Sequence, residues 1–267
     1  MTTGAVPFAF LGKLLIVSLL LGSVGCSGAD EEDAFAGFDA SFDARNQADA
    51  QKPPSPSPAG DAGAVATSDA GADAAPKPWP CLETAHIGDS LTAGVIPKLT
   101  TEYEDRGVDE VTISAGGGRS VLQKVSADKE TGKAAAARIR AEGFAGCWVI
   151  ALGTNDTANI AAGASYTRAS AIDQMMTAID ETKKAPVMWV NTFSTRTSGY
   201  YDNKNMILWN QALTDAKVRW PNLRIFDWAK IAALGTAPFS DGLHHTSAGY
   251  VVRNDAIADA LLATFPK

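Results

Sequence analysis

From residue 81 onward, short apolar segments alternate with longer segments of helical pattern, and this alternation restricts the fold more than any other feature of the chain. The apolar segments are continuous, which is typical of strands covered on both faces. Strands are expected at residues 84–87, 108–113, 147–152, 186–190 and 223–226, and helices at 133–142, 169–184, 206–219 and 248–265. The pattern predicts an α/β domain, a three-layer α/β/α sandwich with a central, mostly parallel five-stranded sheet.

Glycine and polar residues follow three of the predicted strands, in the segments 88–90, 116–118 and 153–156. Parallel strands bring their carboxyl ends to one edge of a sheet, and ligands of such folds bind beyond that edge. We therefore expect the functional site to lie where these segments meet.

The net charge of −7 is unevenly distributed along the 267 residues. Residues 27–79 hold ten acids and three bases and are rich in Ala, Asp, Pro and Gly, which predicts a disordered linker. Residues 1–26 carry one base, so the predicted domain, 80–267, has a net charge of only −1. Without clustered Lys and Arg, the chain is not expected to bind nucleic acid.

Residues 1–26 have the pattern of an export signal. Lys13 precedes an apolar run at 14–21, and small residues follow it up to Cys26. The segment resembles a bacterial lipoprotein signal, which implies that Cys26 is lipidated and anchors an exported protein to the membrane of the cell envelope. Ser23 departs from the aliphatic residue usual at that place. The alternative is an ordinary secretory signal with an incidental cysteine.

Three histidines are available as a catalytic base, His86, His244 and His245. His86 lies within the first predicted strand and is expected to pack or to form hydrogen bonds. Asp241 precedes His244 by three residues in a glycine-containing turn, so its carboxylate can reach the imidazole Nδ1. Ser90 follows the first strand at the start of a predicted helix, where backbone N–H groups can face a developing negative charge.

Two other motifs are excluded by spacing. The nucleophile elbow of α/β-hydrolases requires a glycine two residues after the serine, where this chain has Thr92. Residues 116–118 lack the spacing of a dinucleotide-binding fingerprint.

Four segments in sequence order, 88–91, 116–120, 153–156 and 241–244, match the signature blocks of the SGNH (GDSL-type) hydrolases. The chain resembles this family over residues 82–265. The resemblance implies the flavodoxin-like fold of these enzymes and the activity of a serine esterase.

The resemblance also implies a role for individual residues. Ser90 would be the nucleophile, His244 the general base and Asp241 the residue that orients it. The oxyanion would be bound by the backbone N–H groups of Ser90 and Gly118 and by the side-chain amide of Asn155. Gly118 is selected from its glycine run because a polar pair follows it, as in the family. No metal-ligand spacing is present and no cofactor is expected.

Weaker candidates for contact with substrate are Arg119, Asp156, Tyr200, Tyr201 and His245. Exposure on the surface is the alternative for His245. The tyrosines belong to a loop, 192–205, that contains Arg196 and either stacks against a sugar or acyl group or is an ordinary polar connector.

Cys81 lies nine residues before Ser90, and Cys147 lies eight before Asn155. If the serine and the asparagine follow neighbouring parallel strands, the two cysteines lie at nearly equal depth at the opposite ends. A disulfide is expected in an exported protein, with two free thiols as the alternative.

The predicted function is hydrolysis of short acyl esters, most plausibly acetyl esters of carbohydrate, through an acyl-enzyme. Because the base must be neutral, activity should rise with pH through the range in which imidazole loses its proton, about 6–7. One alternative is an O-acyltransferase acting on cell-envelope polysaccharide, because 209–210 and 227–228 resemble that branch of the family. The other is a non-catalytic envelope-binding lipoprotein.

Overall fold

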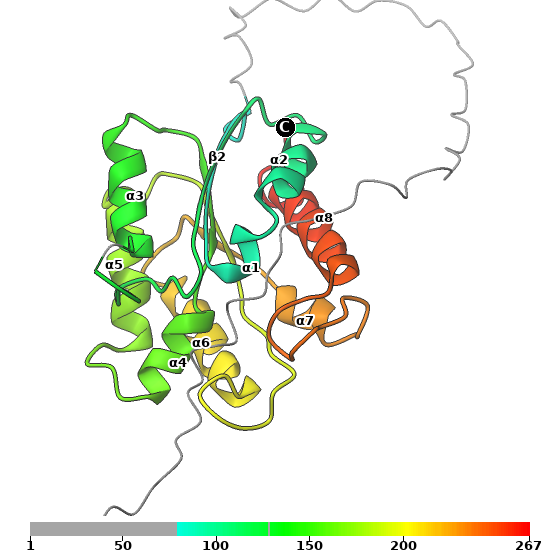
Figure 1. Cartoon of the computed structure of the whole chain (residues 1–267). Helices are drawn as coiled ribbons and strands as arrows, with labels where there is room; N and C mark the ends of the chain where they lie inside the picture. Colours follow the sequence, from blue (N-terminus) through cyan, green and yellow to red (C-terminus); the bar gives the residue numbers. More distant parts are fainter. Residues whose placement is uncertain (1–78, 128) are drawn as a thin grey trace, which may run out of the picture. The chain divides into compact units, whose positions relative to one another are not determined.

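The computed structural model describes residues 79–127 and 129–267 (Figure 1). The predicted signal segment with Cys26, and the predicted linker up to residue 78, lie outside the described residues. Trp79, the last residue assigned to the linker, is buried, and its indole N–H donates to the carbonyl of Phe265. The folded domain therefore includes Trp79.

Five strands form one parallel sheet in the order β2-β1-β3-β4-β5, which confirms the predicted fold class. The strands are β1 (Glu83–Gly88), β2 (Glu110–Ala115), β3 (Cys147–Ala151), β4 (Val187–Val190) and β5 (Leu223–Phe226). The helices are α1 (Ser90–Ala93), α2 (Ile96–Glu104), α3 (Gly132–Ala141), α4 (Thr154–Ala161), α5 (Arg168–Asp180), α6 (Asn203–Ala216), α7 (Trp228–Ala232) and α8 (Ser247–Thr264). In the described part of the chain, no helix combines the length and apolarity needed to cross a membrane.

The centre of the sheet is buried on both faces, and β3 and β4 are apolar at every position. In β3, Trp148 and Ile150 belong to a core shared with α3, α5 and α6. Val149 and Ala151 of the same strand belong to a second core, shared with α2, α7 and α8. Successive side chains of a strand point to opposite faces, so continuous apolar runs stabilise two helical layers at once. Figure 1 shows α3 and α5 on one side of the sheet and α2 and α8 on the other.

The order of the strands reverses at β1 and β3. The chain passes from β1 to β2 on one side and then returns to place β3 on the other side of β1. Gly88, at the end of β1, lies in register with Ala115 of β2 and with Ala151 of β3. Such a reversal of strand order is where open α/β sheets bind their ligands. The segments that follow β1, β2 and β3 therefore start at the same level of the carboxyl edge of the sheet.

A disulfide joins Cys81 and Cys147 at the other end of the same two strands. Cys147 is the first residue of β3 and lies in register with Thr84 of β1. The Cα atoms of the two cysteines are 4.8 Å apart, well within the limit of about 7 Å for a disulfide. The bridge links the start of β3 to the segment that leads into β1.

Candidate active site

Ser90 stands at a sharp turn between β1 and α1. The strand ends at Gly88, where an added Cβ would lie 2.3 Å from the hydroxyl oxygen of Thr92. Asp89 caps the helix by accepting the N–H of Leu91 at 2.9 Å. The turn leaves Ser90 partly exposed at the carboxyl edge of the sheet. α1 has only four residues, so a helix dipole contributes little at this turn. The group that can stabilise a negative charge next to the serine is the backbone N–H of Ser90 itself.

A continuous chain of hydrogen bonds joins Ser90, His244 and Asp241. The Oγ of Ser90 lies 3.0 Å from Nε2 of His244, although the residues are 154 positions apart. On the other side of the ring, Nδ1 of His244 lies 2.8 Å from Oδ2 of Asp241. The carboxylate therefore fixes the tautomer in which Nδ1 carries the proton and Nε2 can accept one.

The carboxylate of Asp241 is held by its own turn. Its Oδ1 accepts the backbone N–H of Leu243 at 2.8 Å and that of His244 at 2.6 Å. Burial raises the pKa of the Asp241 carboxyl, but the hydrogen bonds from the His244 ring and from these two N–H groups outweigh burial and hold the pKa at about 2. Because this pKa lies below that of an unfolded aspartate, the ionised carboxylate stabilises the native state above about pH 4 and loses that effect as the pH falls toward 2.

The pH profile of activity is expected to follow from this arrangement. Because Asp241 stays ionised far below neutral pH, it does not titrate near neutrality, and we expect deprotonation of the imidazole to control activity on the acid side. We predict that log(kcat/KM) for an uncharged ester rises with a limiting slope of one on the acid side and becomes independent of pH once the imidazole is neutral. A slope of two would contradict this assignment, because it would require a second group to lose its proton together with the base.

Asn155 faces the turn that carries Ser90 from the start of α4. An added Cβ on the preceding cap residue, Gly153, would lie 2.2 Å from Nε1 of Trp209, and its φ of 130° also requires glycine. The Nδ2 of Asn155 donates to the carbonyl of Arg119 at 3.0 Å and lies 3.5 Å from Oδ2 of Asp89. The asparagine therefore bridges the glycine loop after β2 and the turn that carries Ser90.

Gly118 adopts a left-handed conformation in the loop after β2, with a φ of 68°. A side chain would be strained there, and its Cβ would lie 2.8 Å from Val125. Among the residues that the structure describes, the backbone N–H groups of Gly118 and Ser90 have no hydrogen-bond acceptor. Both donors remain available for an oxygen of a substrate.

Asp156 does not face substrate, contrary to the prediction. Its side chain is fully buried, and its carboxylate accepts the N–H of Val121 at 3.0 Å and the hydroxyl of Tyr166 at 3.2 Å. Burial raises the pKa of Asp156 to about 7 despite these hydrogen bonds. This residue anchors the glycine loop to α4.

Arg119 is likewise turned toward its own loop. The guanidinium donates to the carbonyl of Ser114 at 2.7 Å and to the carbonyl of Glu130 at 3.1 Å, and only 9% of the side chain is exposed. Its donors hold the two ends of the glycine loop together, so the prediction of a substrate contact is wrong.

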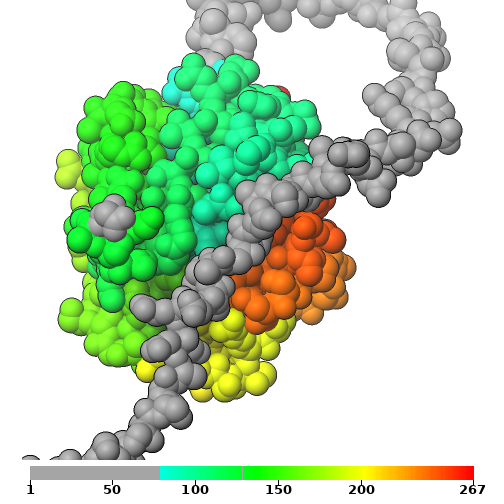
Figure 2. All heavy atoms as spheres, in the orientation of Figure 1, coloured from blue at the N-terminus to red at the C-terminus, as the bar shows by residue number. Residues whose placement is uncertain are grey.

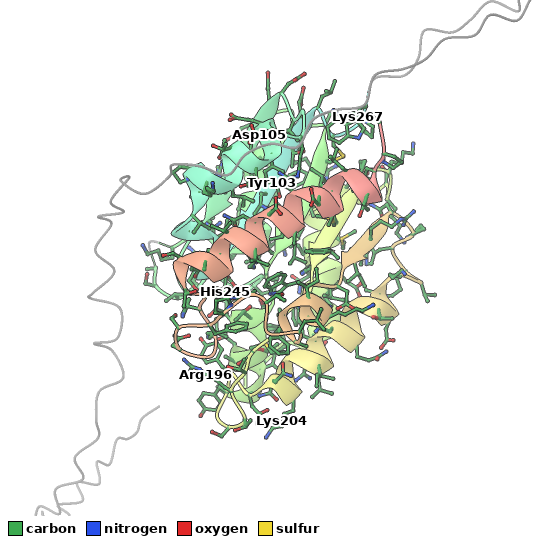
Figure 3. The ribbon with its side chains drawn as sticks, turned by 90° about the vertical axis from the view of Figure 1, so that its right-hand side faces the viewer. Tyr103, Asp105, Arg196, Lys204, His245 and Lys267 are labelled. Atoms are coloured by element: carbon green, nitrogen blue, oxygen red, sulfur yellow. A yellow bond between two sulfur atoms is a disulfide. The ribbon has the colours of Figure 1, made fainter. Side chains whose placement is uncertain are left out.

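His245 is neither a substrate contact nor a surface residue. It is 3% exposed, and its ring packs against the rings of Trp228, Phe239 and Tyr250. Burial, with a smaller effect of Arg253, lowers the pKa of His245 to about 4, so the ring is neutral. Figure 3 shows it inside the molecule, near the start of α8.

His86 is buried in the sheet and forms hydrogen bonds, as predicted. Its Nδ1 lies 2.8 Å from the hydroxyl of Tyr103 and its Nε2 lies 3.3 Å from that of Thr92. Burial, together with the charge of Arg253, lowers the pKa of His86 to about 3. The ring therefore stays neutral beside Thr92, two residues after Ser90.

The loop between β4 and α6 contacts two residues of the site, Asn155 and Asp241. The hydroxyl of Tyr201 donates to Oδ1 of Asn155 at 3.1 Å, whereas Tyr200 is 60% exposed. Arg196 pairs with the Asp241 carboxylate at 3.4 Å and donates to the Asp241 carbonyl at 3.2 Å. Figure 2 shows the segment around residue 200 (yellow) beside the segment around residue 240 (orange) at the surface. In Figure 3, Arg196 is labelled close to Lys204, at the start of α6.

Arg253 lies near the site but is not among the residues predicted from the sequence. It lies in α8, is 2% exposed and donates to the carbonyl of Leu91, the residue directly after Ser90. A lone arginine on the inward face of an apolar helix is the signal that could have identified it. Within the described ranges, no group of three or more His, Cys, Asp or Glu side chains could hold a metal ion.

Comparisons with known proteins give similarity in structure only. Neither the protein-family models nor the curated proteins include a match to the chain. A carbohydrate acetylesterase family member from Sinorhizobium meliloti superposes with a TM-score of 0.55 at 14% identity, over 69% of this chain and 99% of that one. The aryl esterase of M. smegmatis gives 0.53 at 16% identity, over 68% and 98% of the two chains.

The C-terminal catalytic domain of peptidoglycan O-acetyltransferase A from Streptococcus pneumoniae, solved with a methylsulfonyl adduct, gives a TM-score of 0.52 at 16% identity. The match covers 68% of this chain and 90% of that domain. At such identities the likeness concerns the fold and not the activity. The described domain, with its parallel sheet ordered β2-β1-β3-β4-β5, has the fold of the SGNH hydrolases.

Proposed function

We propose that this domain is a serine esterase that hydrolyses short acyl esters, with Ser90 as nucleophile, His244 as general base and Asp241 as the residue that orients the base. The observation that carries the proposal is the hydrogen-bond chain from the serine hydroxyl through both nitrogens of the imidazole to the carboxylate. That chain supplies what a neutral hydroxyl needs to become a nucleophile, a base within reach and a fixed tautomer. It also argues against a non-catalytic binding lipoprotein.

The reaction proceeds in two acyl transfers. His244 Nε2 takes the proton of Ser90 as Oγ attacks the carbonyl carbon of the ester, and the carbonyl oxygen becomes an oxyanion. The imidazolium returns that proton to the leaving alcohol, and the acyl group stays on Oγ. A water molecule, deprotonated by the same nitrogen, then attacks the acyl carbon, and collapse of the second intermediate releases the carboxylic acid and restores the serine hydroxyl.

The oxyanion is held by three donors, the N–H groups of Ser90 and Gly118 and one N–H of the Asn155 amide. The first two lack acceptors among the described residues, and the third lies beside the nucleophile turn. Preorganised donors of this kind stabilise the charge that develops in the transition state, and removal of one typically lowers turnover by about 10²–10³-fold.

A short acyl group on carbohydrate fits the surroundings of Ser90. Polar side chains lie next to the turn that carries Ser90: Asn155 contacts Asp89, and Tyr201 contacts Asn155. Such groups favour a polar substrate over a long alkyl chain. The exposed ring of Tyr200 on the neighbouring loop offers a flat apolar surface of the kind that stacks against a sugar. Acetyl esters of carbohydrate are therefore the proposed substrate class.

Export is part of the proposal, with Cys26 as the site of a lipid anchor. The Cys81–Cys147 disulfide supports it, because disulfides persist in oxidising compartments and are rare in the reducing cytosol. We expect the mature protein to lie in the cell envelope, with its domain connected to the anchor by residues 27–78.

The proposal predicts a covalent acyl-enzyme on Ser90. After mixing with 4-nitrophenyl acetate and quenching in acid within the first turnover, the peptide containing Ser90 should gain the mass of one acetyl group. A Ser90→Ala variant should show no acetylation at this peptide. Acetylation of another residue, with Ser90 unmodified, would contradict the assignment.

The product of the same reaction separates hydrolase from transferase. With an oligosaccharide present as a second acceptor, we expect free acetate to be the main product, because the partly exposed Ser90 and His244 admit water. If acetylated oligosaccharide accumulates faster than acetate, the acyltransferase alternative replaces the hydrolase.

A further inference from the structure

The side chain of Asn155 has two possible orientations, and only one of them is useful for catalysis. An amide rotated by half a turn about its last bond exchanges its oxygen and its nitrogen. With Nδ2 toward the nucleophile turn, the amide can donate to an oxyanion. With Oδ1 there, two negatively polarised oxygens would face each other, and the transition state would be destabilised.

The partners of Asn155 select the useful orientation. The carbonyl of Arg119 lies 3.0 Å from Nδ2 and can only accept a hydrogen bond, so the nitrogen belongs on that side. The Oδ1 on the other side then requires a donor. The hydroxyl of Tyr201 supplies it at 3.1 Å. The second N–H of Nδ2 has the long 3.5 Å contact with Asp89 and can turn to a substrate oxygen.

Tyr201 is itself well placed to remain a donor. Burial, with a smaller effect of the Asp89 charge, raises the pKa of its phenol, so the hydroxyl keeps its proton. The guanidinium of Arg196 lies over the tyrosine ring, 5.7 Å from its centroid, and the same guanidinium pairs with Asp241. One loop thus contacts the oxyanion side of the site through Tyr201 and the acid–base side through Arg196.

We infer that Tyr201 is a positioning residue of the esterase: its hydroxyl orients the Asn155 amide so that an N–H faces the oxyanion. The inference rests on the proposed function, and it changes the role of Tyr201 from contact with substrate to control of a catalytic group. The hydrogen bond acts on the transition state more than on the bound ester, because the oxyanion forms only as the nucleophile attacks.

The test is a double-mutant cycle measured with 4-nitrophenyl acetate. Tyr201→Phe should lower kcat about tenfold, as expected for the loss of one hydrogen bond, with KM changed by less than about twofold. In the Asn155→Ala background, the same change should have almost no further effect, because the amide that it orients is gone. A merely structural role for the tyrosine would lower activity equally in both backgrounds.

Tyr166→Phe is the matched control. It removes a phenol hydroxyl that donates to Asp156, the neighbour of Asn155 in the same helix, and kcat should stay within about twofold of wild type. Wild-type kcat in Tyr201→Phe, or full additivity with Asn155→Ala, would overturn the inference. The comparison of wild type with Ser90→Ala tests the proposed function separately. If Ser90→Ala is inactive, the proposed function stands even when the inference about Tyr201 fails. If Ser90→Ala is as active as the wild type, the proposed function and the inference both fail.

Discussion

Replacement of Ser90 by alanine is expected to lower kcat for 4-nitrophenyl acetate by at least about 10⁴-fold while the domain remains folded. In the proposed mechanism the hydroxyl forms the acyl-enzyme, and its loss leaves only the oxyanion donors and binding, which give a small residual rate. Alanine is well tolerated at the first turn of a helix, and Ser90 is partly exposed, so the unfolding temperature should change little. Initial rates and thermal unfolding of the same preparations measure both effects.

His244→Ala should have a comparable effect, and the double variant with Ser90→Ala should be no slower than either single variant, because the two groups act as a unit. Ser165→Ala is a suitable control, since it removes an exposed hydroxyl between α4 and α5. A Ser90→Ala variant that keeps more than about a tenth of wild-type turnover would exclude the serine as nucleophile.

Loss of the Cys81–Cys147 disulfide is expected to lower the free energy of unfolding by about 4 kcal/mol, which is the chain-entropy value for a closed loop of this length. The cysteines are 66 residues apart, so the bridge closes a long loop and restricts the unfolded chain strongly. Urea unfolding of the oxidised protein and of Cys81→Ala/Cys147→Ala measures the difference. A reducing agent should destabilise the wild type and leave the double variant unchanged.

The Cys81→Ala/Cys147→Ala variant should lose activity at temperatures at which the wild type remains folded and active. Ser90 and Asn155 follow the two strands that the bridge connects, and their alignment depends on the pairing of β1 with β3. A difference in unfolding free energy below about 1 kcal/mol would show that the bridge contributes little to the native state, and would weaken the argument for an oxidising compartment.

The strands could be predicted from the sequence because burial on both faces leaves continuous apolar runs. The four longer predicted helices were also found, with ends within a few residues. The short helices α2, α4 and α7 were not predicted. In α4 the residues from Thr154 to Thr157 are polar and yet buried, so the segment has no amphipathic pattern. Its burial depends on contacts with the glycine loop and with α6, which are distant in sequence.

The convergence of Ser90, His244 and Asp241 could be anticipated because each belongs to a local motif with a distinct chemical requirement. The surrounding polar residues could not be assigned in this way. Asp156 binds the backbone of its own domain, and His245 is enclosed by aromatic rings from three separate segments. A sequence indicates that such a side chain is near the site, but its direction depends on tertiary packing.

The local nature of the turn at 241–244 has a consequence for how such a domain can diverge. Base and carboxylate are three residues apart and are aligned by hydrogen bonds within that turn, so only one long-range distance, from Ser90 to His244, remains to be maintained. Loops elsewhere around the site can then lengthen, shorten or exchange side chains without disturbing proton transfer. One ancestral scaffold can in this way acquire many acyl acceptors and donors while its chemistry stays the same.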